Sequence, residues 1–224
     1  NSGVWQPSVE LLQQDYQVIT IDLPGFGLNV DYNITPYNID IIAQQIMAVV
    51  EQPAVYVGWS LGGLVATQIA HQAPNRTLGL VTVASTPCFV QQENWPGIDP
   101  KVLQLFHRQL SQDIGKTIDN FLKIQAMGSP HIRQDIKQIR ELVMQYSMPS
   151  AEVLDKSLML LEQVDQRSLI AEIQCPWLRM YGKLDGLVPK AVIAQIDRLS
   201  PNSEKHIFTQ ASHAPFISEL SAFV

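Results

Sequence analysis

The chain has 224 residues, a formal net charge of −6 and a hydrophobic fraction of 46%. This length is enough for one large domain with a sizeable buried core, or for a core domain with an inserted subdomain. The acidic balance argues against general affinity for nucleic acids, and no run of about 18 apolar residues is present to span a membrane.

In chain order, short β-rich runs alternate with helical patterns on both sides of a different middle segment. We expect strands over residues 16–22, 54–60, 78–85, 175–182 and 203–209. We expect helices between them over residues 40–52, 61–72 and 189–200. Continuous apolar strands that alternate with helices are typical of a buried parallel sheet with right-handed crossovers. The predicted fold class is therefore α/β, a mostly parallel sheet with helices on both faces.

The middle segment, residues 87–165, lacks strand signals and shows amphipathic helical spacing instead. We expect helices over residues 101–112 and 153–164. An all-helical insertion in an α/β core is a lid or cap, so we predict a core from residues 1–86 and 166–224 and a cap from residues 87–165. The cap is also the most basic part, since residues 101–145 carry a net charge of +3 and the rest of the chain −9.

A candidate nucleophile lies between an expected strand and an expected helix. The sequence Gly58-Trp59-Ser60-Leu61-Gly62 is G-x-S-x-G, the pattern of a nucleophile elbow. We expect glycines there because neighbouring backbone passes too close for a Cβ atom, and we expect a strained Ser60 whose hydroxyl stands above the sheet edge. The following helix directs its free N–H groups at the same point, as an acyl-transfer oxyanion requires. A glycine-rich turn without chemistry is the alternative.

A nucleophilic serine needs a histidine base and an acid, which in this arrangement follow it in the order Ser, Asp or Glu, His. Asp185 lies in the loop after the strand at 175–182, and His213 lies in the loop after the next strand. Groups at the carboxyl ends of parallel strands converge, so we expect Ser60, Asp185 and His213 to meet. Taken singly, a loop aspartate is usually a turn residue and a loop histidine a surface group. The other histidines lack this placement and are expected to be structural: His71, His107, His131 and His206.

The expected chemistry is ester hydrolysis through an acyl-enzyme. Ser60 attacks the carbonyl while His213 takes its proton, and Asp185 holds the imidazole and stabilises its charged form. The N–H of Leu61 is expected to donate to the oxyanion. This chemistry needs no metal and no organic cofactor.

Six motifs along the chain carry a family resemblance. They are DLPGFG (22–27), GWSLGG (58–63), VTVASTPCF (81–89), WPGI (95–98), YGKLDGLVP (181–189) and SHAPFIS (212–218). Together they resemble the BioH family, the pimeloyl-[acyl-carrier protein] methyl ester esterases of biotin biosynthesis, which are α/β-hydrolases. The resemblance implies removal of the methyl group of that ester as methanol, with an acidic acyl-carrier protein as partner.

The resemblance also assigns residues by position. It implies Ser60, Asp185 and His213 as catalytic residues, and Ser60, Leu61 and His213 beside the substrate ester. The cap segment implied to line the acyl chain is Phe121, Leu122, Lys123, Ile124 and Gln125. The residues implied to dock the carrier protein are Lys116, Arg133, Lys137 and Arg140, whereas Asn120 stands where a further base is expected. The alternatives are a merely solvated helical surface for the basic cap and ordinary cap core for Phe121.

The family pattern leads us to expect segments beyond both ends of the sequence. An HGxG-type loop, which supplies the second oxyanion N–H in such hydrolases, and at least one strand are expected ahead of Asn1. More helix is expected after Val224.

Other interpretations of the function stay open. The same fold supports general short-chain carboxylesterases and carbon–carbon bond hydrolases, and a non-catalytic binding protein of this fold is a further alternative. Cys88 and Cys175 lack the spacing of a metal site, so we expect two separate thiols in a reducing compartment. The opening NSGVWQPSVE does not resemble a signal peptide. We expect a cytoplasmic monomer without nucleic-acid or membrane partners.

Overall fold

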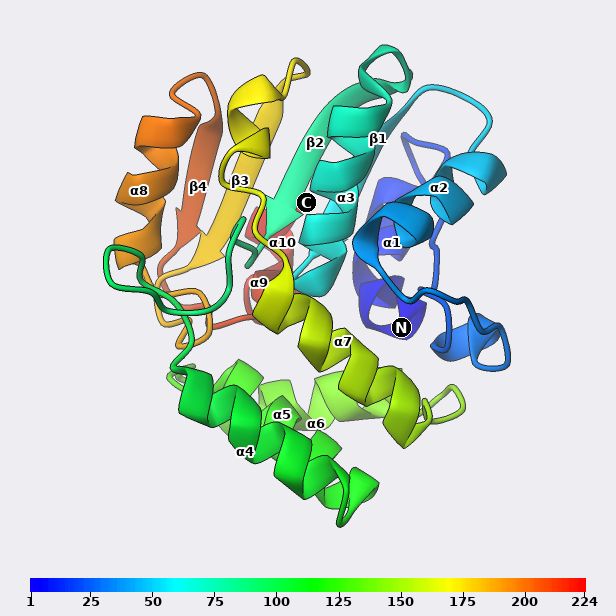
Figure 1. Cartoon of the computed structure of the whole chain (residues 1–224), viewed down its shortest axis with the longest axis vertical. Helices are drawn as coiled ribbons and strands as arrows, with labels where there is room; N and C mark the ends of the chain where they lie inside the picture. The colour runs from blue at the N-terminus through cyan, green and yellow to red at the C-terminus, as the bar shows by residue number, and fades with distance from the viewer.

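The computed structural model describes all 224 residues, and its sheet has four parallel strands in the order β1-β2-β3-β4 (Figure 1). The strands are β1 (Ala54–Trp59), β2 (Thr77–Val83), β3 (Trp177–Gly182) and β4 (Glu204–Phe208). All four point the same way, so their carboxyl ends lie along one edge of the sheet. This parallel sheet confirms the predicted α/β fold class.

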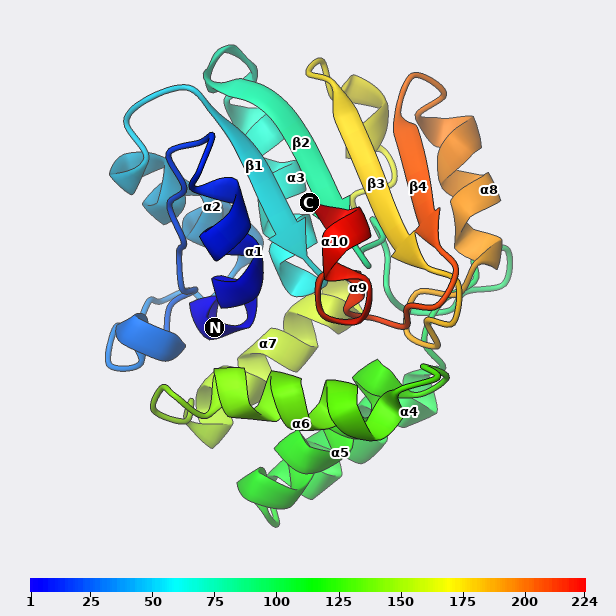
Figure 2. The same cartoon turned by 180° about the vertical axis from the view of Figure 1, so that it is seen from behind.

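Helices cover both faces of the sheet. Outside the cap they are α1 (Gln6–Leu12), α2 (Ile39–Val49), α3 (Leu61–Gln72), α8 (Ala191–Leu199), α9 (Pro215–Ser218) and α10 (Leu220–Phe223). Helices α3 and α8 each connect neighbouring parallel strands in the same direction across the sheet, and right-handed crossovers therefore place both on one face. Figure 2 shows α1, α9 and α10 in front of the opposite face. None of the helices has the length and apolar character needed to cross a bilayer.

Four helices between β2 and β3 form the cap at the carboxyl ends of the strands (Figures 1 and 2). They are α4 (Pro100–Leu110), α5 (Ile114–Ala126), α6 (Ile132–Val143) and α7 (Ala151–Gln163). Short 3-10 helices occur elsewhere: Ser2–Trp5, Gly27–Asn29, Pro74–Arg76 and Leu169–Glu172. The two cap helices expected from amphipathic spacing are confirmed as α4 and α7. The domain limits at residues 87 and 165 stay a prediction.

Two buried clusters join the cap to the rest of the molecule. The larger cluster includes Ile42 and Leu64 from α2 and α3 together with Leu103 of α4 and Leu161 of α7. The smaller cluster, on the other face, contains Val4, Val83, Leu122, Ile139, Leu142, Ala214, Phe216 and Ile217. Helices α4 and α7 thus share the first core, whereas α5 and α6 share the second with α9. The cap is held by apolar burial on both sides and not only by its chain connections.

The strand predicted over residues 16–22 is wrong. This segment has no regular structure, and β1 is the edge strand of the sheet. Tyr16 and Ile19 are 68% and 59% exposed. β-branched residues favour extended backbone, but a strand also needs hydrogen bonds to a neighbour, and no strand pairs with this segment. The other predicted strands and helices are confirmed, with ends that shift by three residues or fewer.

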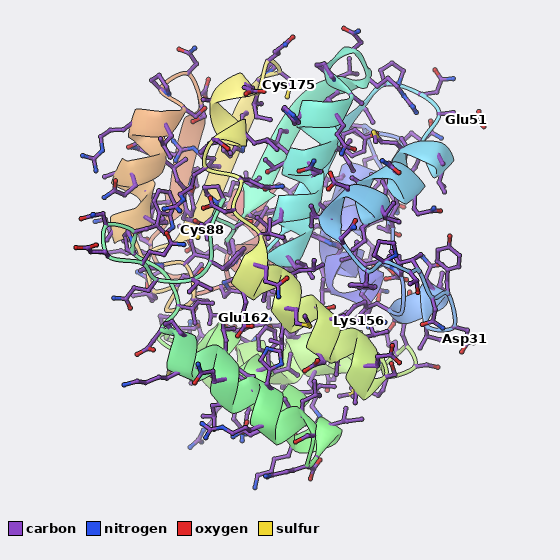
Figure 3. All side chains as sticks on the ribbon, in the orientation of Figure 1. Asp31, Glu51, Cys88, Lys156, Glu162 and Cys175 are labelled. Carbon is purple, nitrogen blue, oxygen red and sulfur yellow. The ribbon has the colours of Figure 1, made fainter.

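The two cysteines are free and lie at opposite ends of the sheet (Figure 3). Cys175 comes just before β3 begins, and Cys88 comes shortly after β2 ends. Burial raises the pKa of both thiols. Because the thiolate is the reactive form, both side chains are less reactive than an exposed cysteine.

Candidate active site

Ser60 occupies the sharp turn between the end of β1 and the start of α3. Its backbone has φ +53° and ψ −119°, in the left-handed half of φ space that residues other than glycine rarely adopt. Three hydrogen bonds hold this conformation. The Ser60 N–H donates to the Val83 carbonyl at 2.9 Å, and the Ser60 carbonyl accepts from Gly63 N–H and Ser85 Oγ, each at 2.9 Å. The strain expected from the G-x-S-x-G pattern is therefore present.

The glycines around Ser60 differ in why they are needed. A Cβ atom at Gly58 would lie 2.1 Å from the Gly62 carbonyl oxygen, and one at Gly63 would lie 2.4 Å from Ser85 Cβ. A Cβ atom at Gly62 would meet no atom within 4 Å. The expectation of close backbone packing is thus confirmed for Gly58 and wrong for Gly62, because Gly62 supplies the obstructing carbonyl and has open space on its own side.

Ser60, His213 and Asp185 form one continuous hydrogen-bonded chain. His213 Nε2 lies 3.0 Å from Ser60 Oγ, and His213 Nδ1 lies 2.8 Å from Asp185 Oδ2. The other Asp185 oxygen accepts from the backbone N–H groups of Leu187 and Val188 at 2.8 and 3.1 Å. Because the carboxylate accepts at Nδ1, the Nδ1–H tautomer is favoured and Nε2 is free to accept the serine proton. The three strand-end loops meet as the sequence order predicts.

The three catalytic side chains differ in how far they are buried. His213 is fully buried and Asp185 is 7% exposed, whereas Ser60 is half-buried. The His213 backbone is also held on both sides. Its carbonyl accepts from Trp59 Nε1 at 2.7 Å, and its N–H donates to the Gln125 carbonyl of α5 at 3.0 Å. The imidazole is therefore fixed by its own backbone as well as by Asp185.

An apolar hollow opens at Ser60. Its other lining residues come from the loop after β2, from the cap helices and from the loop that carries Asp185, and all are hydrophobic: Phe89, Ile98, Val102, Leu103, Phe106, Phe121, Leu161 and Leu187. Among these lining residues, Phe106 and Phe121 pack edge to face, with ring centroids 5.5 Å apart. The lining suits alkyl groups and, apart from Ser60, offers no polar side chain to a charged group. In this structure the space holds about one water molecule, so lining side chains must move to admit an acyl chain.

The residues expected beside the substrate lie in different surroundings in the structure. Leu61 is the first residue of α3, so its N–H has no partner within the helix and is available to an oxyanion. Phe121 lines the hollow and Ile124 packs on the larger core cluster. Gln125 is buried, and its side-chain amide oxygen has no hydrogen-bond partner. Leu122 is buried in the smaller cluster and Lys123 is exposed. Their contacts with substrate stay predictions.

The residues expected to dock a carrier protein are all exposed on α5 and α6, which pack together. Lys116 and Arg133 form no ion pair. Lys137 lies 3.8 Å from Glu141, and Arg140 pairs with Asp119 of α5. Asn120 donates to Gln109 of α4 at 3.3 Å. Lys116 and Arg133 are therefore the two docking candidates whose charges are not compensated by an internal partner.

The remaining histidines lie outside this site. His107 of α4 sits between Asp155 and Glu162 of α7, 2.6 and 3.4 Å from their oxygens, and His71 lies 3.5 Å from Glu172. Figure 3 labels Glu162 on α7. His206 stacks edge to face on Phe208, and His131 precedes α6. No group of three or more His, Cys, Asp or Glu side chains is arranged to bind a metal ion.

Sequence reasoning did not identify several residues that shape the site. Trp59, the variable residue before Ser60, fixes the His213 carbonyl, and Ser85 fixes the Ser60 carbonyl. The side chains of Trp59 and Ser85 both donate to backbone carbonyls of segments that are distant in the sequence. A contact of this kind cannot be predicted from residue types. The hollow lining was also missed apart from Phe121, because amphipathic spacing predicts an apolar face without indicating what that face covers.

Comparison with known proteins agrees with this geometry. Residues 1–220 match the family described as the alpha/beta hydrolase fold. The pimeloyl-[acyl-carrier protein] methyl ester esterase of Photobacterium profundum is 47% identical over all 224 residues and 87% of its own length. The Aliivibrio fischeri protein of the same name is 44% identical, over the whole of this chain and 86% of its own length.

A solved structure supports the fold independently. The esterase from Exiguobacterium antarcticum superposes with a TM-score of 0.86, at 21% identity, over 100% of this chain and 84% of its own. At 21% identity this structural similarity shows the fold alone, whereas the two esterases at 44% and 47% identity show the family. The chain belongs to the α/β-hydrolase family and, within it, to the pimeloyl-[acyl-carrier protein] methyl ester esterases.

Proposed function

We propose that this chain is a serine esterase of biotin biosynthesis that hydrolyses the methyl ester of pimeloyl-[acyl-carrier protein] to methanol and the carrier-bound free acid. The observation that carries the proposal is the hydrogen-bonded chain from Asp185 through His213 to Ser60, which ends in an apolar hollow. Relatives 42–47% identical over the whole chain share this name, which supports the choice of substrate.

In the proposed reaction Ser60 Oγ attacks the ester carbonyl carbon as its proton passes to His213 Nε2. Asp185 stabilises the resulting imidazolium through Nδ1, and the Leu61 N–H donates to the oxyanion. Collapse of the tetrahedral intermediate breaks the bond to the methoxy oxygen, which takes the proton from Nε2 and leaves as methanol. Water then attacks the acyl-enzyme with His213 as base, and the carboxylic acid is released as Ser60 recovers its proton.

The hollow suits this substrate better than a charged one. Each methylene buried there contributes about 0.8 kcal/mol to binding, which favours an alkyl chain. Away from Ser60 the lining residues are all hydrophobic, so a charged group carried further along the chain would be unfavourable there.

The proposed partner is an acidic acyl-carrier protein that docks on the exposed bases of α5 and α6. Lys116 and Arg133 lack ion-pair partners, so their positive charge is available to a partner. Opposite charge on the two proteins raises the association rate and orients the carrier more than it adds raw affinity. We propose that Lys137 and Arg140 assist, and that the enzyme acts as a cytoplasmic monomer without a cofactor.

The test measures methanol release from the carrier-bound methyl ester by wild type, Ser60→Ala and the double variant Lys116→Glu/Arg133→Glu. The matched control is Lys190→Glu/Arg198→Glu, which reverses one exposed lysine and one exposed arginine, both without ion pairs, at the two ends of α8. We expect no release from Ser60→Ala and about a tenfold loss of kcat/KM for the cap variant at low salt. The control variant should keep wild-type activity.

A small aryl ester separates the two parts of the proposal, since it needs Ser60 and no carrier. Unchanged aryl-ester hydrolysis by the cap variant, together with its loss on the carrier substrate, would support docking. Rapid aryl-ester cleavage by wild type without methanol release would reject the pimeloyl substrate and retain the esterase. Equal losses in the cap variant and the α8 control would reject the docking face.

A further inference from the structure

The end of α5 and the turn after it, residues 125–129, contact the loop that carries His213. We call this segment the cap turn. The His213 N–H donates to the Gln125 carbonyl at 3.0 Å, and Ser212 Oγ donates to the Met127 carbonyl at 2.8 Å. Two successive residues of the histidine loop are therefore hydrogen-bonded to one short segment of the cap.

The same segment lies against the loop that carries Asp185. Ser212 Oγ is 3.4 Å from the Leu184 carbonyl, and a Cβ atom at Gly128 would lie 2.9 Å from that carbonyl oxygen. Gly128 has φ +95°, a conformation that suits glycine. Ser212 is 2% exposed. Its hydroxyl thus sits where the cap turn, the acid loop and the base loop meet.

A buried carboxylate extends this contact to α6 and α9. Asp135 of α6 is 5% exposed, and its Oδ2 accepts from Ser129 Oγ at 2.5 Å and from Ser218 Oγ of α9 at 3.1 Å. Leu122 and Phe216 are packed in the same buried cluster. The apolar cluster holds α5, α6 and α9 together. The hydrogen bonds also fix the relative orientation of these helices, because a hydrogen bond weakens steeply when its atoms are misaligned.

We propose that the cap turn positions the catalytic histidine, with Ser212 as the positioning residue. Ser212 touches no reacting atom and acts through the backbone of His213. The cap turn fixes this backbone from one side while Trp59 fixes it from the other. Misplacement of a catalytic group by about 1 Å can lower the rate by about 10²-fold, so a lost anchor should lower kcat with little effect on binding.

One consequence concerns the carrier protein and rests on the proposed function. The exposed bases proposed to dock the carrier lie on α5 and α6, the two helices that the cap turn joins. The docking surface and the anchor of the histidine loop therefore belong to one unit of the cap. The positioning role of Ser212 itself does not depend on the identity of the substrate.

The test compares Ser212→Ala, Ser212→Thr and the control Ser157→Ala. Ser157 is also a buried serine of the cap, and its hydroxyl donates to the Val153 carbonyl at 2.8 Å and lies 3.4 Å from the Tyr37 hydroxyl, away from the histidine loop. Two readouts are used: kcat and KM on a small aryl ester, and the rate at which a fluorophosphonate labels Ser60. For Ser212→Ala we expect both kcat and the labelling rate to fall about tenfold with KM unchanged. The donor retained in Ser212→Thr should restore most of the labelling rate.

Three results would overturn the proposal. These are labelling of Ser212→Ala at the rate of Ser157→Ala, a lower melting temperature with unchanged labelling, and a rise in KM alone. If Ser212→Ala does not fold, Ser129→Ala removes the hydrogen bond from the cap turn to Asp135, and labelling at the wild-type rate there would equally overturn it. A failure of the pimeloyl assignment would appear instead as absent methanol release with labelling intact.

Discussion

Replacement of Gly58 and Gly62 by alanine should have opposite effects on stability, although both are glycines of the same motif. A Cβ atom at Gly58 would lie 2.1 Å from the Gly62 carbonyl oxygen and 2.7 Å from the Gly63 nitrogen. These are backbone atoms at the start of α3, and the oxygen would have to move by about 1.3 Å to reach an ordinary contact. Such overpacking typically destabilises by about 1–3 kcal/mol, and here we expect the upper end because no flexible side chain can give way.

At Gly62 the same methyl group meets nothing within 4 Å. Gly62 is the second residue of α3, where alanine is the better helix former by up to about 1 kcal/mol, so Gly62→Ala should be neutral or stabilising. Urea unfolding gives both free energies, and for a chain of this size each kcal/mol should shift the melting temperature by about 2–4 °C. A Gly62→Ala protein as unstable as Gly58→Ala would refute the steric reasoning.

Three further changes test other parts of the molecule. Asp185→Asn should lower kcat about 10⁴-fold by removing the acceptor that fixes the His213 tautomer, and steady-state ester hydrolysis within tenfold of wild type would contradict this. Phe121→Ala should lower kcat/KM for long-chain methyl esters about tenfold by removing ~1.5 kcal/mol of contact, while methyl acetate is unaffected; equal losses on both would exclude a lining role. Asp197→Asn should destabilise the protein more at neutral pH than at low pH. Burial raises the pKa of Asp197, but hydrogen bonds from Lys205 and Arg179 outweigh it and hold that pKa below its usual value. The stabilisation is therefore present above the unfolded-state pKa of about 3.9 and is lost as the pH falls through the folded-state pKa. Urea unfolding at several pH values measures this, and a deficit independent of pH would contradict it.

The elements that could be predicted from the sequence are those whose hydrophobic pattern is compatible with only one kind of secondary structure. The continuous apolar runs of β1 and β2 favour a parallel sheet, although Val55 and Val57 of β1 and Leu78 of β2 are exposed, and the following helices determine the crossovers. Residues 16–22 carry the same β-forming composition, yet strand formation depends on a neighbouring strand that propensity does not report. The amphipathic spacing of the cap indicated helices but not which of the two buried clusters each helix joins.

The candidate site divides in a similar way. Ser60, Asp185 and His213 could be predicted because the chemistry needs particular side chains at particular strand ends, and the loops bring them together. Trp59 and Ser212 could not, because each donates to a backbone carbonyl, and a carbonyl exists at every position in the chain. Contacts to the backbone leave no pattern in residue types, so they appear only when the fold is known.

Helix geometry explains why residues 121–125 cannot all serve one purpose. Neighbours in a helix point in directions about 100° apart, so only positions three or four apart share a face. Phe121 faces the hollow at Ser60, Leu122 faces the buried cluster with Phe216, and Lys123 faces solvent. Gln125, four residues after Phe121, presents its carbonyl to the His213 N–H. Because α5 is a single rigid helix, a displacement that changes its solvent face also moves the wall of the hollow and the anchor of the base. Any effect of a partner on this cap should therefore reach the hollow and His213 together.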